Sequence, residues 1–317
     1  MPLTVSAAPH IHGGKSSSFI MYLVLLSLLP AAVAGTYIFG LRAAALMLVT
    51  VLSSVAAEAV WQILCKKPVT VKDGSAAVTG LLLAFCLPVT LPYWMAILGG
   101  VFSVIIAKAL FGGLGHNFMN PALCGRAFLM ASFPAAMTTW ALPLSRASLL
   151  GADAATGATP LAEPMRAVPL KDLFLGTTGG CIGETSAVAL LIGAVFLLAT
   201  RVISLHVPVA FLSSAAFFGW MMSPGGLFHG NPLQSILTGG VILGAFFMAT
   251  DYVTGPLTRK GQVIFGIGCG ALTMLIRRFG AYPEGVTYAI LLMNAVSPLI
   301  DRFVTTKPYG KGGARHA

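Results

Sequence analysis

A polar stretch at residues 151–164, GADAATGATPLAEP, lies between two strongly apolar regions of the chain. Its most reactive side chain is the hydroxyl of Thr159, which follows two small residues that let another molecule approach the backbone closely. A hydroxyl displayed in this way can accept a covalent group through a phosphoester bond. An ordinary Thr-Pro turn is the alternative, because Pro160 stiffens solvated turns. The neighbours that complete the pattern are Asp153, Thr156, Gly157 and Ala158.

A second stretch, FGGLGHNFMNPALCGRAF at residues 111–128, brings two amides close together in the sequence. Asn117 and Asn120 are three residues apart, so both side chains can point one way and bind the polar edges of a planar heterocycle. The alternative is that they cap a helix beginning at Pro121. Arg126 lies at the start of the next apolar segment and needs a partner or an interface there, and we expect it to be a further cofactor-binding residue.

Acidic residues within or beside the apolar segments form a third group. Such a side chain is costly in a bilayer and indicates a functional site or a charged partner. Asp251 stands where an apolar segment ends, so a solvated boundary residue is its alternative interpretation. Glu284 follows Pro283 and would suit the dipole in the first turn of a helix. We expect an ion pathway to use Asp251, Glu58 or Glu284, although Glu184 and Asp301 are placed similarly.

The composition excludes a single soluble core. The 317 residues are 57% hydrophobic and 9% charged, whereas soluble domains are about 25% charged. The net charge of +10 comes from basic residues in short loops, without the basic patch and interleaved aromatics of a nucleic-acid site. We therefore expect an integral membrane protein that contacts lipid and does not bind nucleic acid.

Apolar segments long enough to cross a bilayer recur along the chain, which predicts an all-α protein of about ten transmembrane helices. The third, fifth and seventh segments are short or broken near Pro88, Pro134 and Pro208. This count allows two inverted halves of five helices, although no residue-level repeat supports them. The predicted spans are 19–36, 41–63, 76–90, 93–111, 122–139, 184–201, 205–222, 235–251, 262–279 and 285–302.

Loop charges predict the orientation. With ten spans, both termini lie on one side, and 13 of the 19 lysines and arginines fall on that side, which the positive-inside rule makes cytoplasmic. The six on the other side are Arg42, Arg146, Arg166, Lys171, Arg277 and Arg278. The predicted divisions are a cytoplasmic segment at 1–18, a first half at 19–139, an external loop at 140–183, a second half at 184–302 and a basic cytoplasmic tail at 303–317.

The cysteines and the first apolar run have simple interpretations. The five cysteines form no CxxC pair, and most lie in or beside apolar runs, where cysteine behaves as a small hydrophobe. A metal shared with another subunit is the alternative. The first apolar run ends in AVAG, which is similar to a signal-peptidase site, but we expect an uncleaved helix because only Lys15 precedes it.

Four motifs in the same order resemble the NqrB/RnfD family of electron-transport subunits. TGAT after Asp153 is similar to its flavinylation motif, with Ala154 in place of the usual glycine. The other three are GHNFMNPALCGRAF, ATDYVT and the run from GAYPEGV to LLMN. An N-terminal PHIH segment also matches, and the resemblance extends from Pro9 to about Asp301. The NqrB branch has a longer N-terminal extension, so its absence favours the Rnf branch.

The resemblance implies cofactors that the residues alone do not. In the family, a flavin transferase attaches FMN to the last threonine of the motif, which is Thr159 here. Riboflavin is bound without a covalent bond near the two asparagines, which correspond to Asn117 and Asn120. The expected partners are the other membrane and peripheral subunits of the complex, the transferase, and Na+ or H+. The chain lacks GxGxxG and a cluster-type cysteine run, so we expect it to bind neither NAD nor an iron–sulfur cluster.

The implied function is that of a membrane subunit in an ion-translocating ferredoxin:NAD oxidoreductase, an enzyme in which this chain is not catalytic alone. It would relay electrons through flavins in a bacterial inner membrane, coupled to Na+ or H+ transport. The alternative is a ten-helix secondary transporter or channel without a redox cofactor. A flavin on Thr159 distinguishes the two.

Overall fold

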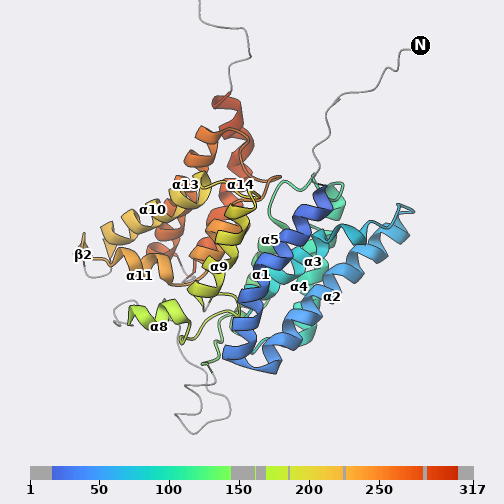
Figure 1. Ribbon diagram of the computed structural model, residues 1–317, viewed down its shortest axis with the longest axis horizontal. Helices are drawn as coiled ribbons and strands as arrows, with labels where there is room; N and C mark the ends of the chain where they lie inside the picture. The colour runs from blue at the N-terminus through green and yellow to red at the C-terminus, as the bar shows by residue number, and fades with distance from the viewer. Residues whose placement is uncertain are drawn as a thin grey trace, which may run out of the picture.

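The computed structural model describes residues 16–143, 161, 169–184, 186–223, 226–280 and 284–305 (Figure 1). Apart from a pair of two-residue strands, β1 (Met222–Ser223) and β2 (Gly226–Leu227), its regular elements are helices. The predicted flavin-bearing residues Asp153, Thr156, Gly157, Ala158 and Thr159 lie outside the described residues.

The helices fall into two sequence groups. The first comprises α1 (Ser17–Phe39), α2 (Leu41–Leu64), η1 (Val71–Asp73), α3 (Ser75–Phe85), α4 (Tyr93–Ile105), η2 (Ala109–Phe111), α5 (Pro121–Ser132) and α6 (Pro134–Met137). The second comprises α8 (Leu170–Leu175), α9 (Ala187–Ala199), α10 (His206–Met221), α11 (Pro232–Leu237), α12 (Val241–Leu243), η3 (Gly244–Met248), α13 (Arg259–Phe279) and α14 (Val286–Phe303).

Membrane-spanning character is confirmed for part of the predicted set. Among the described residues, four segments are long and apolar enough to cross a bilayer: α1, α2, the stretch Tyr93–Phe111 and α13. Three more apolar helices, α3, α9 and α10, are shorter. The structure is therefore that of an all-α membrane protein, while the number of ten crossings stays a prediction.

Proline ends two of the short helices. α3 stops at Phe85, shortly before Pro88, and α5 stops at Ser132, before Pro134. Proline cannot continue a helix because it lacks an N–H and clashes with the preceding turn. Pro208 instead lies in the first turn of α10, where proline is tolerated, so this helix is short and unbroken.

The predicted span at 235–251 is the most broken of all, which the sequence interpretation missed. It comprises α11, α12 and η3, and η3 is a π-helix. A π-helix is rare and frequently marks a functional site. Here it directs the chain toward Asp251.

Each half packs mainly within itself. α2 packs against α3 and α4, and α10 packs along α13. Gly266 and Gly270, one helical turn apart on α13, allow the latter contact: a Cβ on Gly266 would lie 2.7 Å from the Cβ of Ala210 on α10. Such small-residue pairs let helix backbones approach closely in membranes. The halves meet through α1 with α9 and through α5 with α14.

The start of α1 and the end of α14 lie at one end of the molecule, drawn at the top of Figure 1, and we name this end the terminal face. The short helix α8 lies at the other end, drawn at the lower left, which we name the opposite face. The two candidate sites described below lie toward different faces.

Candidate functional site

A cleft opens toward the terminal face between the two halves. It encloses about 790 Å³ of empty space, counting the part that is open to solvent. Its walls come from α1, α3, the loop before α5, η3 and the residues that follow η3. Most of the lining is apolar, and its main polar side chains are Ser75, Thr79, Lys108, Asn117, Asn120, Thr250 and Asp251. Three predicted site residues, Asn117, Asn120 and Asp251, therefore meet in one cleft.

Asn120 both starts α5 and joins the halves. Its Oδ1 accepts hydrogen bonds from Ala122 N at 3.1 Å and Leu123 N at 3.3 Å, and α5 begins at Pro121. This is the capping arrangement that the sequence offered as an alternative to ligand binding. Its Nδ2 donates to the carbonyl oxygen of Met248 in η3 at 3.2 Å. The amide thus fixes one wall of the cleft to the other.

Asn117 and Asp251 face the same cleft from different halves of the molecule. The Asn117 side chain is close enough to interact with the Asp251 carboxylate, while its Nδ2 donates to Met119 O at 3.2 Å. Asp251 accepts from Val253 N at 3.4 Å and from Thr254 Oγ1 at 3.2 Å. Asp251 is therefore a hydrogen-bonded wall residue of the cleft rather than a freely solvated helix end.

A buried ion pair borders the cleft. Lys108 Nζ lies 2.7 Å from Glu58 Oε1 and donates to Ser75 Oγ at 2.6 Å. Lys108 and Glu58 are only 2% and 4% exposed. Ser75 in turn donates to Asp73 Oδ1 at 2.7 Å. The orientation count treated Lys108 as one of the charges of the cytoplasmic side, whereas its side chain is buried and paired with Glu58.

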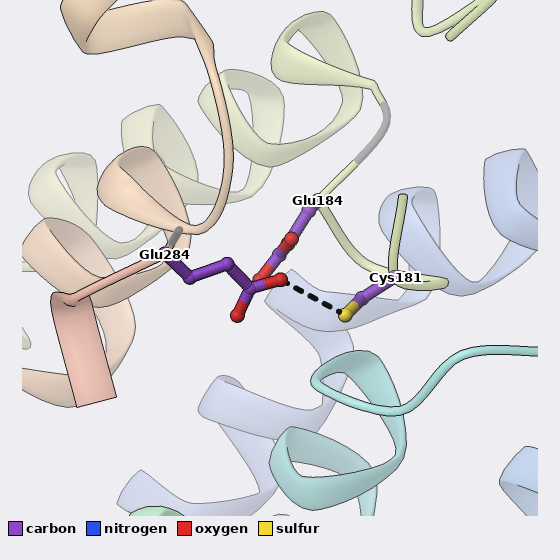
Figure 2. A group of neighbouring side chains, drawn as sticks. All are labelled: Cys181, Glu184 and Glu284. Atoms are coloured by element: carbon purple, nitrogen blue, oxygen red, sulfur yellow. Dashed lines mark hydrogen bonds between the residues drawn. The ribbon is translucent and has the colours of Figure 1, made fainter. Parts of the chain in front are cut away.

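A second charged cluster lies where the halves meet. Figure 2 shows Glu184, Glu284 and Cys181 converging, with the Cys181 thiol directed at a Glu284 carboxylate oxygen at 3.6 Å. Arg126 on α5 pairs with both acids: Nη1 lies 3.2 Å from Glu184 Oε1, and Nη2 contacts Glu284 Oε2. Nη2 also contacts Cys181 Sγ at 3.5 Å. The partner that the sequence required for Arg126 is thus a pair of carboxylates, and Arg126 does not line the cleft.

The ligand atoms of Cys181, Glu184 and Glu284 lie within 4.8 Å of one another, which is close enough to hold a metal ion. The Arg126 guanidinium contacts all three side chains and already supplies the positive charge. Arg277 lies nearby, but its Nε donates to the backbone carbonyl oxygen of Glu284 at 3.1 Å and not to a carboxylate. One guanidinium therefore serves two glutamates, and we interpret the arrangement as an electrostatic clamp.

The position of Glu284 corrects one sequence interpretation. Glu284 does not lie in the first turn of a helix, because α14 begins at Val286. Gly285 precedes it with φ of +66°, a left-handed conformation that glycine adopts at no steric cost. This turn releases Glu284 from the helix and allows its carboxylate to reach Arg126.

A smaller cavity lies toward the opposite face and encloses about 360 Å³. Glu184 and Glu284 line its inner part, and Leu161 lines it together with Leu173 of α8. Leu161 rests on Gly239, where an added Cβ would lie 2.7 Å from Leu161 Cδ1. Leu161 is the described residue nearest in sequence to Thr159.

Three functional features were missed from sequence. Lys108 was counted only as a loop charge, Arg277 only as an external charge, and Glu184 only as one of several acids. The separation in sequence between the partners explains this: 50 residues divide Lys108 from Glu58, and 58 divide Arg126 from Glu184. The usable signal was the presence of basic and acidic residues inside apolar segments. Each such residue needs a partner of opposite charge, but the sequence does not identify which residue that partner is.

Comparisons with known proteins agree with one another. The chain is 50% identical to a subunit of the Na(+)-translocating ferredoxin:NAD(+) oxidoreductase complex of Acetobacterium woodii, over 97% of this chain and 95% of that protein. It is 44% identical to a subunit of the proton-translocating ferredoxin:NAD(+) oxidoreductase complex of Clostridium ljungdahlii, over 97% and 96%. It is 41% identical to a subunit of the ion-translocating oxidoreductase complex of Stutzerimonas stutzeri, over 92% of each.

The family described as NQR2, RnfD, RnfE matches residues 4–310, which is nearly the whole chain. The four motifs that suggested this resemblance all fall inside the matched range. With relatives of up to 50% identity along almost their full length, the chain belongs to the NQR2, RnfD, RnfE family.

Proposed function

We propose that this chain is the RnfD-type membrane subunit of an ion-translocating ferredoxin:NAD+ oxidoreductase complex in a bacterial inner membrane. The observation that carries the proposal is the cleft in which Asn117, Asn120 and Asp251 meet, in a chain whose relatives are named as subunits of such complexes. As one subunit it is not catalytic alone, and its expected partners are the other subunits of the complex.

FMN attached to Thr159 is the first proposed cofactor. Its support is the sequence TGAT, in which the acceptor follows a glycine and an alanine, as in the flavinylation motif. A group on Thr159 is tethered two residues from Leu161, which lines the smaller cavity toward the opposite face. We therefore propose that a flavin transferase modifies the chain on the opposite face.

Riboflavin in the cleft is the second proposed cofactor, and the residues present fit it. Ligand sites typically have mostly apolar walls and a few polar groups, and the lining of this cleft has both properties. Asn117 and Asp251 offer hydrogen-bonding groups to the edge of a planar heterocycle, while Phe246 and Phe247 contribute apolar wall. A bound flavin supplies the one- and two-electron transfer that side chains do not readily perform.

Asp251 is the best candidate for handling the transported ion. Glu58 and Glu284, the other two proposed pathway acids, are held by Lys108 and Arg126. Asp251 has no basic partner among the described ion pairs, and it lines both the cleft and a second hollow of about 1,030 Å³ on the terminal face. The relatives include one named for Na+ and one named for protons, so either ion suits the proposal.

We further propose that the terminal face is cytoplasmic. The basic loop residues that support this orientation include Lys66, Arg201, Arg259 and Arg302. A cysteine placed at either face of the full chain and tested with a membrane-impermeant thiol reagent decides the orientation. If a cysteine on the terminal face is labelled in intact cells, that face is external and the proposed orientation is reversed.

The decisive experiment is ultraviolet in-gel fluorescence of the denatured chain after co-expression with a flavin transferase. A fluorescent band that is lost in Thr159→Ala and kept in Thr139→Ala supports the proposal, because Thr139 is an exposed threonine of the described chain outside the motif. Mass spectrometry of the peptide should then show added FMN on Thr159. An unmodified wild-type peptide would favour a transporter or channel without a redox cofactor, for which the broken helices offer some support.

A further inference from the structure

Lys108 is a buried cation on the wall of the cleft. It lies in the turn after α4, is 2% exposed, and borders the same empty space as Asn117 and Asp251. A strongly hydrated ammonium is costly to remove from water and is seldom buried without a role or a partner. Its position therefore calls for an explanation beyond loop charge.

Its immediate contacts hold the ammonium in place. Nζ has Glu58 Oε1 at 2.7 Å and Ser75 Oγ at 2.6 Å, while the hydroxyl of Ser75 is itself oriented by donation to Asp73 Oδ1. An ammonium has three donors, and these contacts use two of them. The side chain is thus fixed, and its third N–H has no partner among the described hydrogen bonds.

The charges are arranged unevenly about the cleft. Lys108 lines it, whereas its partner Glu58 on α2 lies behind it and is not part of the lining. The pair therefore presents its positive end to the cleft. Asp251 presents a negative charge on the wall contributed by the second half. Between these walls the lining is mainly apolar, so the electric fields of the Lys108 and Asp251 charges are weakly screened.

We infer that the Lys108 ammonium determines which edge of a bound ligand lies against its wall of the cleft. It attracts an edge that is negatively charged or that becomes negatively charged when the ligand is reduced. The inference rests on the proposed function and extends it. An isoalloxazine ring that takes up two electrons and one proton carries negative charge on its N1 and C2 carbonyl edge. The cleft should consequently bind reduced flavin more tightly than oxidised flavin.

The test uses the assembled complex carrying Glu58→Gln with Lys108→Met, which removes the pair without leaving a buried carboxylate unpaired. The measurements are the acid-releasable flavin content and the reduction potential of that flavin, followed spectroscopically. We expect the preference for reduced over oxidised flavin to fall at least tenfold, which is about 30 mV to lower potential for a two-electron couple. Lys108→Arg should retain most of the preference, because it keeps the charge.

The matched control is Lys72→Met, which removes an exposed lysine from the same face outside the cleft. It should leave the potential unchanged. If the double variant loses its flavin during purification, free riboflavin is added back in oxidised and in reduced form. Equal weakening of both forms, or an unchanged potential, would overturn the inference.

Failure of the proposed function is distinguishable. If the wild-type complex contains no acid-releasable flavin and binds none when riboflavin is added, the cleft is not a flavin site and both statements fail. If the wild-type and the double variant bind flavin with the same potential, only the role of Lys108 is refuted. If the reduction potential is lower in the double variant and unchanged in Lys72→Met, both the flavin site and the role of Lys108 are supported.

Discussion

The two buried charge clusters differ in how many acids share one cation. The clamp of Arg126, Glu184 and Glu284 joins three chain segments, and one guanidinium serves two carboxylates. In the other cluster Lys108 pairs with Glu58 alone and borders the open cleft. Both clusters keep a buried polar atom without a hydrogen-bond partner among the described residues: Arg126 Nε in the clamp and Glu58 Oε2 in the pair. The clamp therefore suits structural anchoring, whereas the pair beside the cleft suits ligand binding.

This difference predicts which cluster controls stability. Breaking a buried ion pair costs more than removing it whole, because the remaining charge is left uncompensated. The clamp has two acids that depend on Arg126, whereas the cleft pair has one acid that depends on Lys108. Variants of the two clusters should therefore lose stability in the order given below.

Arg126→Met should be the most damaging change, with a loss of about 3–5 kcal/mol or more, because it leaves both Glu184 and Glu284 without their shared cation. Thermal unfolding of the detergent-purified protein measures the loss. Arg126→Met combined with Glu184→Gln and Glu284→Gln should recover much of it, since neither buried carboxylate is then left without its cation. If Arg126→Met were as stable as the parent protein, Arg126 would not be holding Glu184 and Glu284 as proposed.

Lys108→Met should be destabilising by about 3 kcal/mol, less than Arg126→Met, because one buried carboxylate loses its partner. Adding Glu58→Gln should bring stability to within about 1 kcal/mol of the parent, since both charges are then absent. The same unfolding measurement applies. Equal losses in the single and double variants would mean that packing, rather than charge, sets the cost.

Asn120→Ala should cost about 1 kcal/mol through loss of the α5 cap, together with the contact to Met248. Asn120→Ser keeps a capping hydroxyl and should lose less. Denaturant or thermal unfolding of the two variants gives the difference. If serine proved no better than alanine, the link to Met248, rather than the cap, would carry the effect.

Asp251→Asn should change stability least, by about 0.5 kcal/mol, because the amide oxygen can still accept from Val253 N and the Thr254 hydroxyl can rotate to accept from the amide NH2. Its effect belongs to function: ion transport by the complex in sealed vesicles should fall at least tenfold while acid-releasable flavin is retained. Asp172→Asn, in α8 on the opposite face, is the matched acid control and should transport normally. Normal transport in Asp251→Asn would remove this residue from the ion pathway.

Local features of the site were predictable from sequence. The Asn-Pro pair at Asn120 and Pro121 predicts a helix start, and α5 begins there because both residues act within one turn. Proline likewise predicts the ends of α3 and α5. The broken span that contains η3 was not predicted, because the apolar residues on both sides of Thr238, Gly239 and Gly240 were interpreted as one span, although two adjacent glycines indicate a break.

The linear chain alone establishes a basic, helical membrane protein of the NQR2, RnfD, RnfE family, because apolar runs and ordered motifs need no folding to be recognised. The charge partners emerge from the folded molecule: Glu58 holds Lys108, Arg126 holds Glu184 and Glu284, and Asn120 reaches Met248 across a separation of 128 residues. Membrane burial requires each charge to find a partner, but helix packing selects which one.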